Sequence, residues 1–451
     1  MRTAVSFVLM VPLLPAVLLA ASPSFEARDC APAAASAGAR CGVVYVPENH
    51  ARPRGRKIGL KVIVLPATGS SDHLRAQYDL EGGPGFAATD FLEFYAGDGA
   101  AYRQSRDIVL ADMRGTGGSN PLRCAGLEEY QKRIPLAPMY PPELVAECAR
   151  QSSVASDPTQ YSTAAAARDI DLVRRALGYR QLDLNAISYG TTLALRYLAD
   201  FPQQVHAAAL MGTVPAEATP PRFHASAADS SLAKLAAASS DFDTNLRAAL
   251  DRSGSVPGLT ADIVMEKLRT WLYAPMTRAR VPARLQHAAQ GDFSDFTASS
   301  PGRVFADGLY LSITCAESFA RMDVGAAIAA ARTTRFGAYR LERQRAACEQ
   351  WPKAPVDTRL MRTVDSAVPV LFISGELDPV SPPSWTHELA PHFANGRVAV
   401  APLGAHVFDG LTGLDSCLDA TIIRLFDSGD ARGLDVSCFA AMQPESAGAA
   451  P

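Results

Sequence analysis

Short apolar runs alternate with longer amphipathic runs along two parts of the chain. Residues 181–188 form an apolar run of the kind that makes a buried strand. Immediately before it, residues 162–178 place apolar side chains at helical spacing, with Ser162 or Thr163 as the cap and Gly178 as the stop. This alternation predicts an α/β fold, in which helices join the strands of a mostly parallel sheet.

The same alternation extends the predicted sheet in both directions along the chain. Val, Ile and Tyr dominate the strand-like runs, and Gly or Pro bounds them. The run over 106–119 is continuously apolar before its Gly-rich end, which favours a buried parallel strand. Further strands are expected within 41–50, 57–67, 76–85, 205–214, 367–380 and 396–408, and helices within 189–202 and 383–393.

The alternation is interrupted between about residues 214 and 365. Helical spacing dominates there, for example over 225–251 and 260–276, and no clear buried strand is visible. We therefore expect an α/β core in two parts, 27–213 and 366–441, separated by a helical cap insertion over 214–365.

The first residues have the pattern of a secretory signal peptide over 1–22. A positively charged start is followed by an apolar run over 4–19, broken by two prolines, and then by small residues. The run is short for a membrane span, and an N-terminal anchor is the alternative. We expect cleavage near residues 21–24, export to the periplasm or the medium, and no stable membrane insertion afterwards.

The cysteine content agrees with export, because an even number of cysteines in an exported chain indicates disulfides. The eight cysteines allow roughly a hundred pairing schemes. The simplest scheme joins neighbours along the chain: Cys30–Cys41, Cys124–Cys148, Cys315–Cys348 and Cys417–Cys438. Neither a Cys-x-x-Cys pair nor a Cys/His cluster with the spacing of a metal site occurs in the sequence.

Composition supports a large core and argues against a nucleic-acid partner. Hydrophobic residues make up 48% of the 451 residues, and the formal net charge is −3. No basic run stands out that could follow a phosphate backbone. The oligomeric state stays open.

Ser188 lies where the strand over 181–188 meets the helix over 189–202. A sharp turn between a strand and a helix holds a serine hydroxyl outward, but it needs small residues two positions away on each side. Ala186 and Gly190 meet that need. The pattern indicates a nucleophile elbow, with an ordinary turn serine as the alternative.

A serine hydroxyl becomes a nucleophile only beside a base that is oriented by an acid. In sites built on such an elbow, the order along the chain is serine, acid, histidine. Asp378 lies just past the end of the strand predicted within 367–380, and Glu376, closer to that strand, is the competing acid. His406 lies in a loop after a later apolar run, and both positions fall at carboxyl ends of predicted strands.

The attacked carbonyl would also need two backbone N–H donors for its oxyanion. Tyr189, the residue after the serine, supplies one in this type of site. The Gly-rich segment before it supplies the other, with Gly83 as the first choice and Gly82 as the alternative, because glycines let the backbone approach a substrate. A plain turn is the simpler explanation of this segment. No metal or organic cofactor is needed.

Five segments occur in an order that is similar to a known group of enzymes. They are GGPG at 82–85, DMRGTGGS at 112–119, AISYGTTLAL at 186–195, GELDPVSPP at 375–383 and GAHVF at 404–408. Together they resemble the secreted tripeptidyl aminopeptidases and prolyl aminopeptidases of the α/β-hydrolase superfamily. The resemblance runs from about Cys41 to Cys438, and the last segment looks like the C-terminal domain of the tripeptidyl group.

The resemblance implies an α/β-hydrolase fold with Ser188 as nucleophile, Asp378 as acid and His406 as base. It also implies oxyanion donors at Gly83 and Tyr189, and no cofactor. In the family, Asp112 and Arg114 brace the loops beside the site. The chain departs from the family at Met113 and Ala186, which sterics should tolerate, and at Glu81, which leaves contacts near the oxyanion loop in question.

Aminopeptidases of this kind also need a carboxylate that holds the charged amine of the substrate, because a buried charge must be paired. Glu317 lies in the helical insertion, two residues after Cys315. We assign the amine-binding role to Glu317, with an exposed glutamate on a helix surface as the alternative.

Three function classes follow from these residues. The first is an exported serine aminopeptidase that releases short N-terminal units, from a single residue to a tripeptide, through an acyl-enzyme. The second is an esterase or amidase that uses the same triad on small acyl substrates. The third is a binding protein or a hydrolase that has lost its activity.

Overall fold

The computed structural model describes residues 23–133, 136–298, 304–363 and 365–445. The predicted signal peptide over 1–22 lies outside this part of the chain. Among the described residues, no helix has the length and apolar character needed to cross a membrane.

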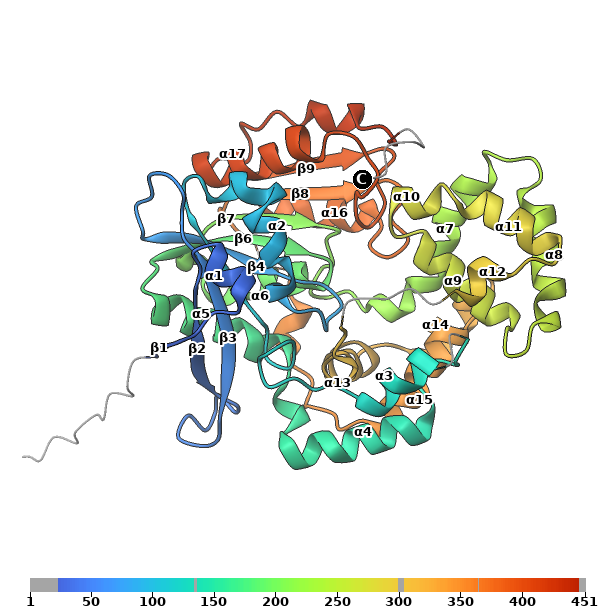
Figure 1. Ribbon diagram of the computed structural model, residues 1–451, viewed down its shortest axis with the longest axis horizontal. Helices are drawn as coiled ribbons and strands as arrows, with labels where there is room; N and C mark the ends of the chain where they lie inside the picture. The colour runs from blue at the N-terminus through green and yellow to red at the C-terminus, as the bar shows by residue number, and fades with distance from the viewer. Residues whose placement is uncertain (1–22, 134–135, 299–303, 364, 446–451) are drawn as a thin grey trace, which may run out of the picture.

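A nine-stranded sheet organises the molecule, with the strand order β1-β2-β3-β5-β4-β6-β7-β8-β9 (Figure 1). The contacts from β5 through β4 and β6 to β9 are all parallel, and those among β1, β2, β3 and β5 are antiparallel. The strands are β1 (Phe25–Arg28), β2 (Arg40–Pro47), β3 (Lys57–Leu65), β4 (Arg75–Leu80), β5 (Asp107–Ala111), β6 (Gln181–Ile187), β7 (Val205–Met211), β8 (Val370–Gly375) and β9 (Gly396–Ala401).

Burial along the strands follows their place in the sheet. Every residue of β5 and of β8 is buried, as expected for strands that are covered on both faces. The edge-proximal β2 alternates between buried and more exposed residues instead. The prediction of a parallel strand within 106–119 is right for one neighbour of β5 only, because β5 runs parallel to β4 and antiparallel to β3.

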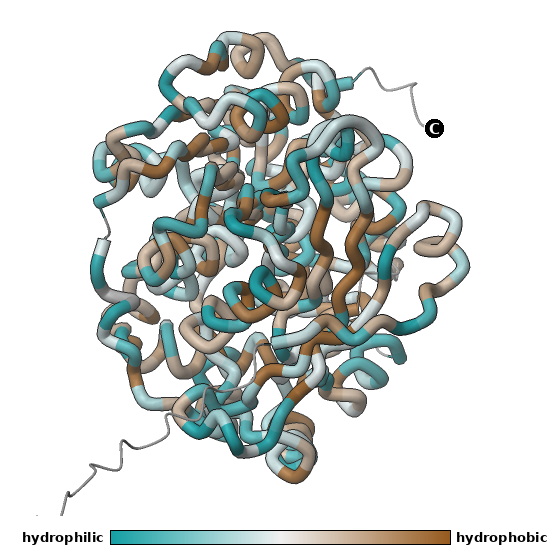
Figure 2. Tube along the Cα trace, turned by 90° about the vertical axis from the view of Figure 1, so that its left-hand side faces the viewer, coloured by the Kyte–Doolittle hydropathy of each residue, from teal (hydrophilic) through white to brown (hydrophobic). Residues whose placement is uncertain are grey.

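Helices cover both faces of the sheet, and its apolar strands run through the interior (Figure 2). Residues of α5, α6 and α16 contribute to the core on one face, and residues of α2 and α17 to the core on the other. The helices of the two core segments are α1 (Pro32–Ser36), α2 (Leu92–Ala96), α3 (Ala125–Arg133), α4 (Pro142–Ala155), α5 (Thr163–Leu177), α6 (Tyr189–Asp200), α16 (Pro383–Leu389) and α17 (Ala420–Ser428).

The ends of α5 confirm the predicted helix over 162–178. The Ser162 side chain accepts a hydrogen bond from the Ala165 N–H, and Gly178 ends the helix in the left-handed region with φ 85°. The helix delivers the chain to β6, which precedes the predicted elbow.

Between β7 and β8, the described regular elements are helical. Helices α7 to α12 form a lobe beside the sheet (Figure 1) and have an apolar core of their own. The helices of this segment are α7 (His224–Ala236), α8 (Phe242–Arg252), α9 (Ala261–Trp271), α10 (Pro275–Arg278), α11 (Val281–Ala289), α12 (Ser294–Thr297), α13 (Asp307–Ile313), α14 (Val324–Ala331) and α15 (Tyr339–Gln350).

The domain boundaries at 27–213, 214–365 and 366–441 stay a prediction. Helices α3 and α4 belong to the first range, yet they share an apolar cluster with α13 and α15 of the second. The cap side of the molecule therefore draws residues from before β6 as well as from the insertion.

The four disulfides confirm the pairing of neighbouring cysteines. They are Cys30–Cys41, Cys124–Cys148, Cys315–Cys348 and Cys417–Cys438. The second and third lie in the cluster where α3 and α4 meet α13 and α15. Each joins residues at most 33 positions apart, so each closes a short loop.

Asp307 is a buried carboxyl group at the start of α13, on the cap side. Burial raises its pKa to about 7, Glu128 adds to the rise, and a hydrogen bond from the Tyr140 hydroxyl at 3.3 Å opposes it. The folded chain therefore keeps this proton up to about pH 7, whereas the ordinary pKa of 3.8 applies after unfolding.

We expect Asp307→Asn to stabilise the protein at pH 8 by on the order of 1–3 kcal/mol, because the wild type must there bury an anion or unfold. The difference should shrink as the pH falls below 7 and be small at pH 4, close to the unfolded-state pKa of 3.8. Chemical unfolding at pH 4 and pH 8 measures it. Equal pH slopes for the two proteins would contradict the assignment.

Candidate active site

Ser188 occupies a tight turn between β6 and α6. Its backbone angles are φ 57° and ψ −125°, a region that a non-glycine residue rarely adopts. The neighbours explain why: a Cβ on Gly190 would lie 2.1 Å from the Leu80 carbonyl oxygen, and one on Gly82 would lie 3.0 Å from the Ser188 Cβ. Only glycine fits at position 190, and a Cβ at position 82 would be tight, so the chain is pressed against the end of β4 and Ser188 is held outward.

Asp378 and His406 form a buried pair at the ends of β8 and β9. The Asp378 Oδ2 lies 2.9 Å from the His406 Nδ1, and the two residues are 4% and 5% exposed. The Val380 and Ser381 N–H groups donate to the Asp378 Oδ1 at 2.7 and 2.9 Å. The carboxylate is therefore fixed by its own loop, and it leaves the Nε2 of His406 as the nitrogen that can serve a nucleophile.

The competing acid points elsewhere. The Glu376 side chain is about half exposed and pairs with Lys234 of α7, whose Nζ lies 2.6 Å from its Oε1. Sequence reasoning missed Ser381, whose hydroxyl donates to the Asp378 Oδ2 at 2.8 Å and lies 3.3 Å from the His406 Nδ1. A serine three residues after an aspartate in a Pro-rich loop was its sequence signature.

Gly212, directly after β7, brings Ser188 and His406 to the same place. The Ser188 N–H donates to the Met211 carbonyl at 2.9 Å, and a Cβ on Gly212 would lie 3.1 Å from the His406 Cε1. Over the residues that the structure describes, no hydrogen bond joins the Ser188 hydroxyl to the imidazole. Such bonds are often long before a substrate binds, so this arrangement suits a nucleophile and its base.

The insertion supplies a further contact to the histidine. The Tyr273 ring packs edge-on against the His406 ring, with 5.3 Å between the centroids. The Val407 N–H donates to the Tyr273 carbonyl oxygen at 3.0 Å. Tyr273 follows α9, so a cap element braces the loop that carries His406.

The two predicted oxyanion donors border the same cavity as Ser188. Gly83 and Tyr189 both line it, and within the described ranges neither backbone N–H donates a hydrogen bond. Gly83 has φ 113°, which favours glycine, and a cis peptide bond joins it to Pro84. Two unpaired N–H groups beside a nucleophile are what an oxyanion hole requires.

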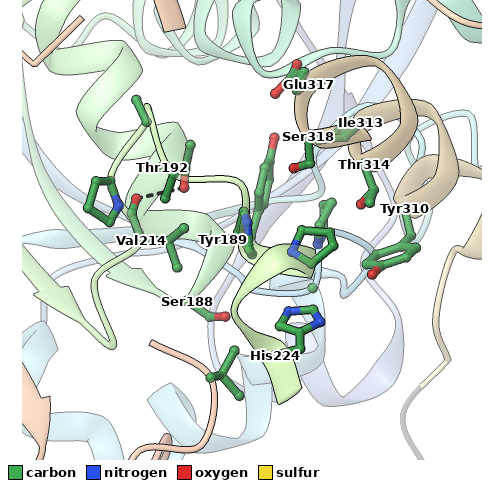
Figure 3. Close-up of a pocket in the computed structure, with 18 of the residues that line it drawn as sticks. Ser188, Tyr189, Thr192, Val214, His224, Tyr310, Ile313, Thr314, Glu317 and Ser318 are labelled. Carbon is green, nitrogen blue, oxygen red and sulfur yellow. Dashed lines mark hydrogen bonds between the residues drawn. The ribbon is translucent and has the colours of Figure 1, made fainter. Parts of the chain in front are cut away.

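The cavity has a volume of about 640 Å³ including its mouth. Its walls come from the two loops of the core and from the insertion. Figure 3 shows Ser188 and His224 toward one end and Glu317 at the other, with the Tyr189 ring between them. The cavity is large enough for a short peptide segment.

Glu317 is buried at 8% exposure and lies in a π-helical turn, η7 (Thr314–Phe319), after α13. Its Oε1 accepts from the Thr163 N–H at 2.8 Å, and its Oε2 accepts from the Thr163 hydroxyl at 2.6 Å. Burial raises the pKa of Glu317, while the bonds from Thr163 oppose the rise. The alternative of an exposed glutamate is therefore excluded.

The Glu317 carboxylate is also coupled to the elbow. The Thr163 hydroxyl lies 2.8 Å from the Tyr189 hydroxyl, so one threonine at the start of α5 touches both groups. Burial, and then the charge of Glu317, raises the pKa of the Tyr189 phenol, which stays protonated.

The sequence did not point to His224, the first residue of α7. It lines the cavity with Ser188, and burial and nearby guanidinium groups lower its pKa well below the usual range. Its imidazole is therefore neutral near pH 7.

Asp112 and Arg114 brace loops, as the resemblance implies. Arg114 is fully buried and makes a two-point contact with Asp169 at 2.5 and 2.7 Å. The Asp112 carboxylate accepts from the Thr89 and Gly118 N–H groups at 2.9 and 2.8 Å. These bonds tie the segment after β5 to its neighbours.

A family model described as the alpha/beta hydrolase fold matches residues 80–408. The chain belongs to the α/β-hydrolase fold family. This range runs from the end of β4 to just past His406, so it contains every residue of the arrangement described above.

Curated relatives include peptidases. A tripeptidyl aminopeptidase of Streptomyces lividans is 31% identical over 182 residues, which are 37% of this chain and 34% of that protein. The serine protease Hip1 of Mycobacterium bovis is 30% identical over 196 residues, which are 41% of this chain and 37% of that protein. Each match spans only about a third of the relative's length. Together with the family, these relatives support a serine hydrolase.

Solved structures with a similar course of the chain include two related to proline iminopeptidases. One is the proline iminopeptidase of Mycobacterium smegmatis, with 17% identity, a TM-score of 0.45, and coverage of 87% of this chain and 100% of that one. The other is a proline iminopeptidase-related protein from Thermus thermophilus, with 20% identity, a TM-score of 0.41, and coverage of 86% and 97%.

We expect Gly190→Ala to reduce activity at least about 10-fold, because an added Cβ must push the turn away from the Leu80 carbonyl at a cost of about 1–3 kcal/mol. Gly254→Ala is the control, since a Cβ there meets nothing within 4 Å. Activity and melting temperature are measured for both. Wild-type activity in Gly190→Ala would show that the turn is not under this constraint.

Proposed function

We propose that this protein is an exported serine aminopeptidase that releases short N-terminal units from peptides. The observation that carries the proposal is a single cavity that holds Ser188, two unpaired backbone N–H donors and the buried Glu317 carboxylate. The peptidases among its relatives agree with this choice over other hydrolase activities.

The geometry gives each group a step in the reaction. The His406 Nε2 takes the proton of the Ser188 hydroxyl as the oxygen attacks the substrate carbonyl. Asp378 holds the opposite nitrogen of the ring and stabilises the imidazolium. The Gly83 and Tyr189 N–H groups receive the oxyanion. His406 then protonates the leaving amine, and water hydrolyses the acyl-enzyme in a second round.

Asp378→Asn should reduce kcat on a peptide substrate by about 10³–10⁴, because the amide cannot hold the histidine in its working tautomer. Ser188→Ala should reduce kcat at least as far. Glu376→Gln is the matched control, since this carboxylate lies in the same loop but faces Lys234. Initial rates at saturating substrate test the set, and an active Ser188→Ala variant would require another nucleophile.

Glu317 is the proposed site for the charged substrate amine. It faces the cavity, and its only hydrogen-bond donor side chain in the described structure is Thr163. Burial raises the pKa of Glu317 against the hydrogen bonds from Thr163 and the charge of Arg321, so an ammonium group bound beside the carboxylate would stabilise the anion further. An enzyme of this design selects substrates with a free N-terminus.

Glu317→Gln should raise KM for free-amine peptides at least about 10-fold, because it removes one partner of a buried ion pair. The same peptides with an acetylated N-terminus should be cleaved poorly by the wild type and no worse by the variant. Steady-state kinetics on both forms measure this. Equal cleavage of free and acetylated peptides by the wild type would favour the esterase or amidase alternative.

Export belongs to the same proposal. The signal-peptide pattern over 1–22 and four disulfides support an oxidising compartment, the periplasm or the medium. Comparison of the secreted and cellular fractions for the full chain tests it. A panel of aminoacyl, dipeptidyl and tripeptidyl amides gives the number of residues released per cut.

A further inference from the structure

Positive charge gathers near His224, which lies at the opposite end of the cavity from Glu317 (Figure 3). Glu266 of α9 binds two guanidinium groups: Arg340 of α15 donates to its Oε2 through Nε and Nη2 at 2.8 and 2.6 Å, and Arg269 donates through Nε at 3.3 Å. Although burial opposes it, the two arginines lower the pKa of Glu266 to about 2. The cluster therefore carries two positive charges against one negative charge.

This cluster is joined to the catalytic histidine through Tyr273. The Arg269 Nη1 donates to the Tyr273 hydroxyl at 2.7 Å, and its guanidinium lies 5.4 Å from the centre of that ring. The Tyr273 ring also packs against the His406 ring in a T-shaped contact. The positive cluster consequently lies on the cap side of His406, one aromatic ring away from it.

Some guanidinium nitrogens of the cluster donate no hydrogen bond to the described protein. Within the described part of the chain, Arg340 Nη1 and Arg269 Nη2 donate to no protein group, and neither is among the fully enclosed unpaired nitrogens. The His224 imidazole makes no hydrogen bond with the described residues either, and its Nδ1 is enclosed without a partner. His224 lines the cavity beside Ser188 (Figure 3).

Of these residues, His224 lines the cavity, and the two arginines lie behind it, near enough for their charges to act on its imidazole. After burial, the charges of Arg340 and Arg269 are the largest causes that lower the pKa of His224, and His406 contributes too. A neutral imidazole at the cavity wall, close to two guanidinium groups, can donate a hydrogen bond to an anion without adding a charge that would need its own partner.

The proposed reaction indicates which part of a bound peptide lies on this side of the site. His406 protonates the leaving amine, so the departing part of the peptide passes His406, whereas the retained acyl part extends toward Glu317. We propose that Arg340, Arg269 and His224 bind the terminal carboxylate of the leaving product, so that the enzyme prefers short peptides with a free C-terminus close to the cut bond. This inference rests on the proposed function.

The group that the cluster would bind is a carboxylate. An acidic side chain downstream of the cut bond carries the same group. The test therefore uses three forms of each free-amine peptide, from three to eight residues long: the C-terminal acid, the carboxamide, and the carboxamide with a glutamate after the cut bond. The kcat/KM of the wild type is measured for each form.

We expect the short acids to be cleaved at least about 10-fold more efficiently than the matching carboxamides, with a preference that fades as the peptide lengthens. Equal kcat/KM for acid and carboxamide at every length would overturn the inference and leave the aminopeptidase proposal intact. A preference for the glutamate form alone would overturn it in favour of a side-chain site. Failure to cleave any free-amine peptide would reject the proposed function, and the inference with it.

Variants locate the effect. Arg340→Gln should bring the acid-to-carboxamide ratio close to one, and Arg340→Lys should keep part of the preference because it keeps the charge. Arg345→Gln is the matched control on the same helix, where the side chain is about half exposed and, among the residues that the structure describes, pairs only with Glu349.

The ratio compares two substrates on one protein, so a general loss of folded enzyme leaves it unchanged. His224→Gln and Arg269→Gln are measured in the same way. Arg269 also contacts Tyr273, so its replacement can alter the rate for both substrates, and the ratio removes such a common change. An unchanged ratio in all three replacements by glutamine would overturn the assignment.

Discussion

The close approach of the chain at the end of β6 is the constraint on which the site depends. Gly190 lies so near the Leu80 carbonyl oxygen that a Cβ would meet it at 2.1 Å, and the resulting turn holds Ser188 in the left-handed region. The apolar core on the face of the sheet that α6 covers stabilises this conformation, because α6 cannot move away from the sheet without exposing that core. The reactive hydroxyl is thus positioned by packing.

The parallel order β6-β7-β8-β9 brings the other groups of the site next to that turn. Adjacent parallel strands end at the same edge, so the loops after β6, β7, β8 and β9 meet there. Ser188, Gly212, Asp378 and His406 each follow one of these strands. The absence of a side chain at Gly212 then lets the imidazole lie close to the strand ends, next to the nucleophile.

The helical insertion takes part in the chemistry that we propose, beyond covering the cavity. Tyr273 packs on His406, Lys234 holds Glu376 away from the acid position, and the Ser231 hydroxyl bonds the Leu377 carbonyl at 2.7 Å. The insertion also brings a negative group, Glu317, to one side of the nucleophile and a net positive cluster to the other. A peptide has the complementary polarity, with an ammonium at its start and a carboxylate at its end.

The sequence by itself indicated the α/β alternation, the helical interruption, neighbour pairing as the simplest disulfide scheme, and the order of a serine, an acid after the strand within 367–380, and His406. These features depend on local periodicity, short loops and turn chemistry, which neighbouring residues dictate. Only the tertiary structure decided between Asp378 and Glu376, because both follow one strand and differ in direction alone. It also brought Glu317 to Thr163, which lies 154 positions earlier, and placed His224, Tyr273 and two arginines around the histidine. Such contacts depend on how separate elements pack. The pattern of residues along one helix does not specify which distant side chain that helix will contact.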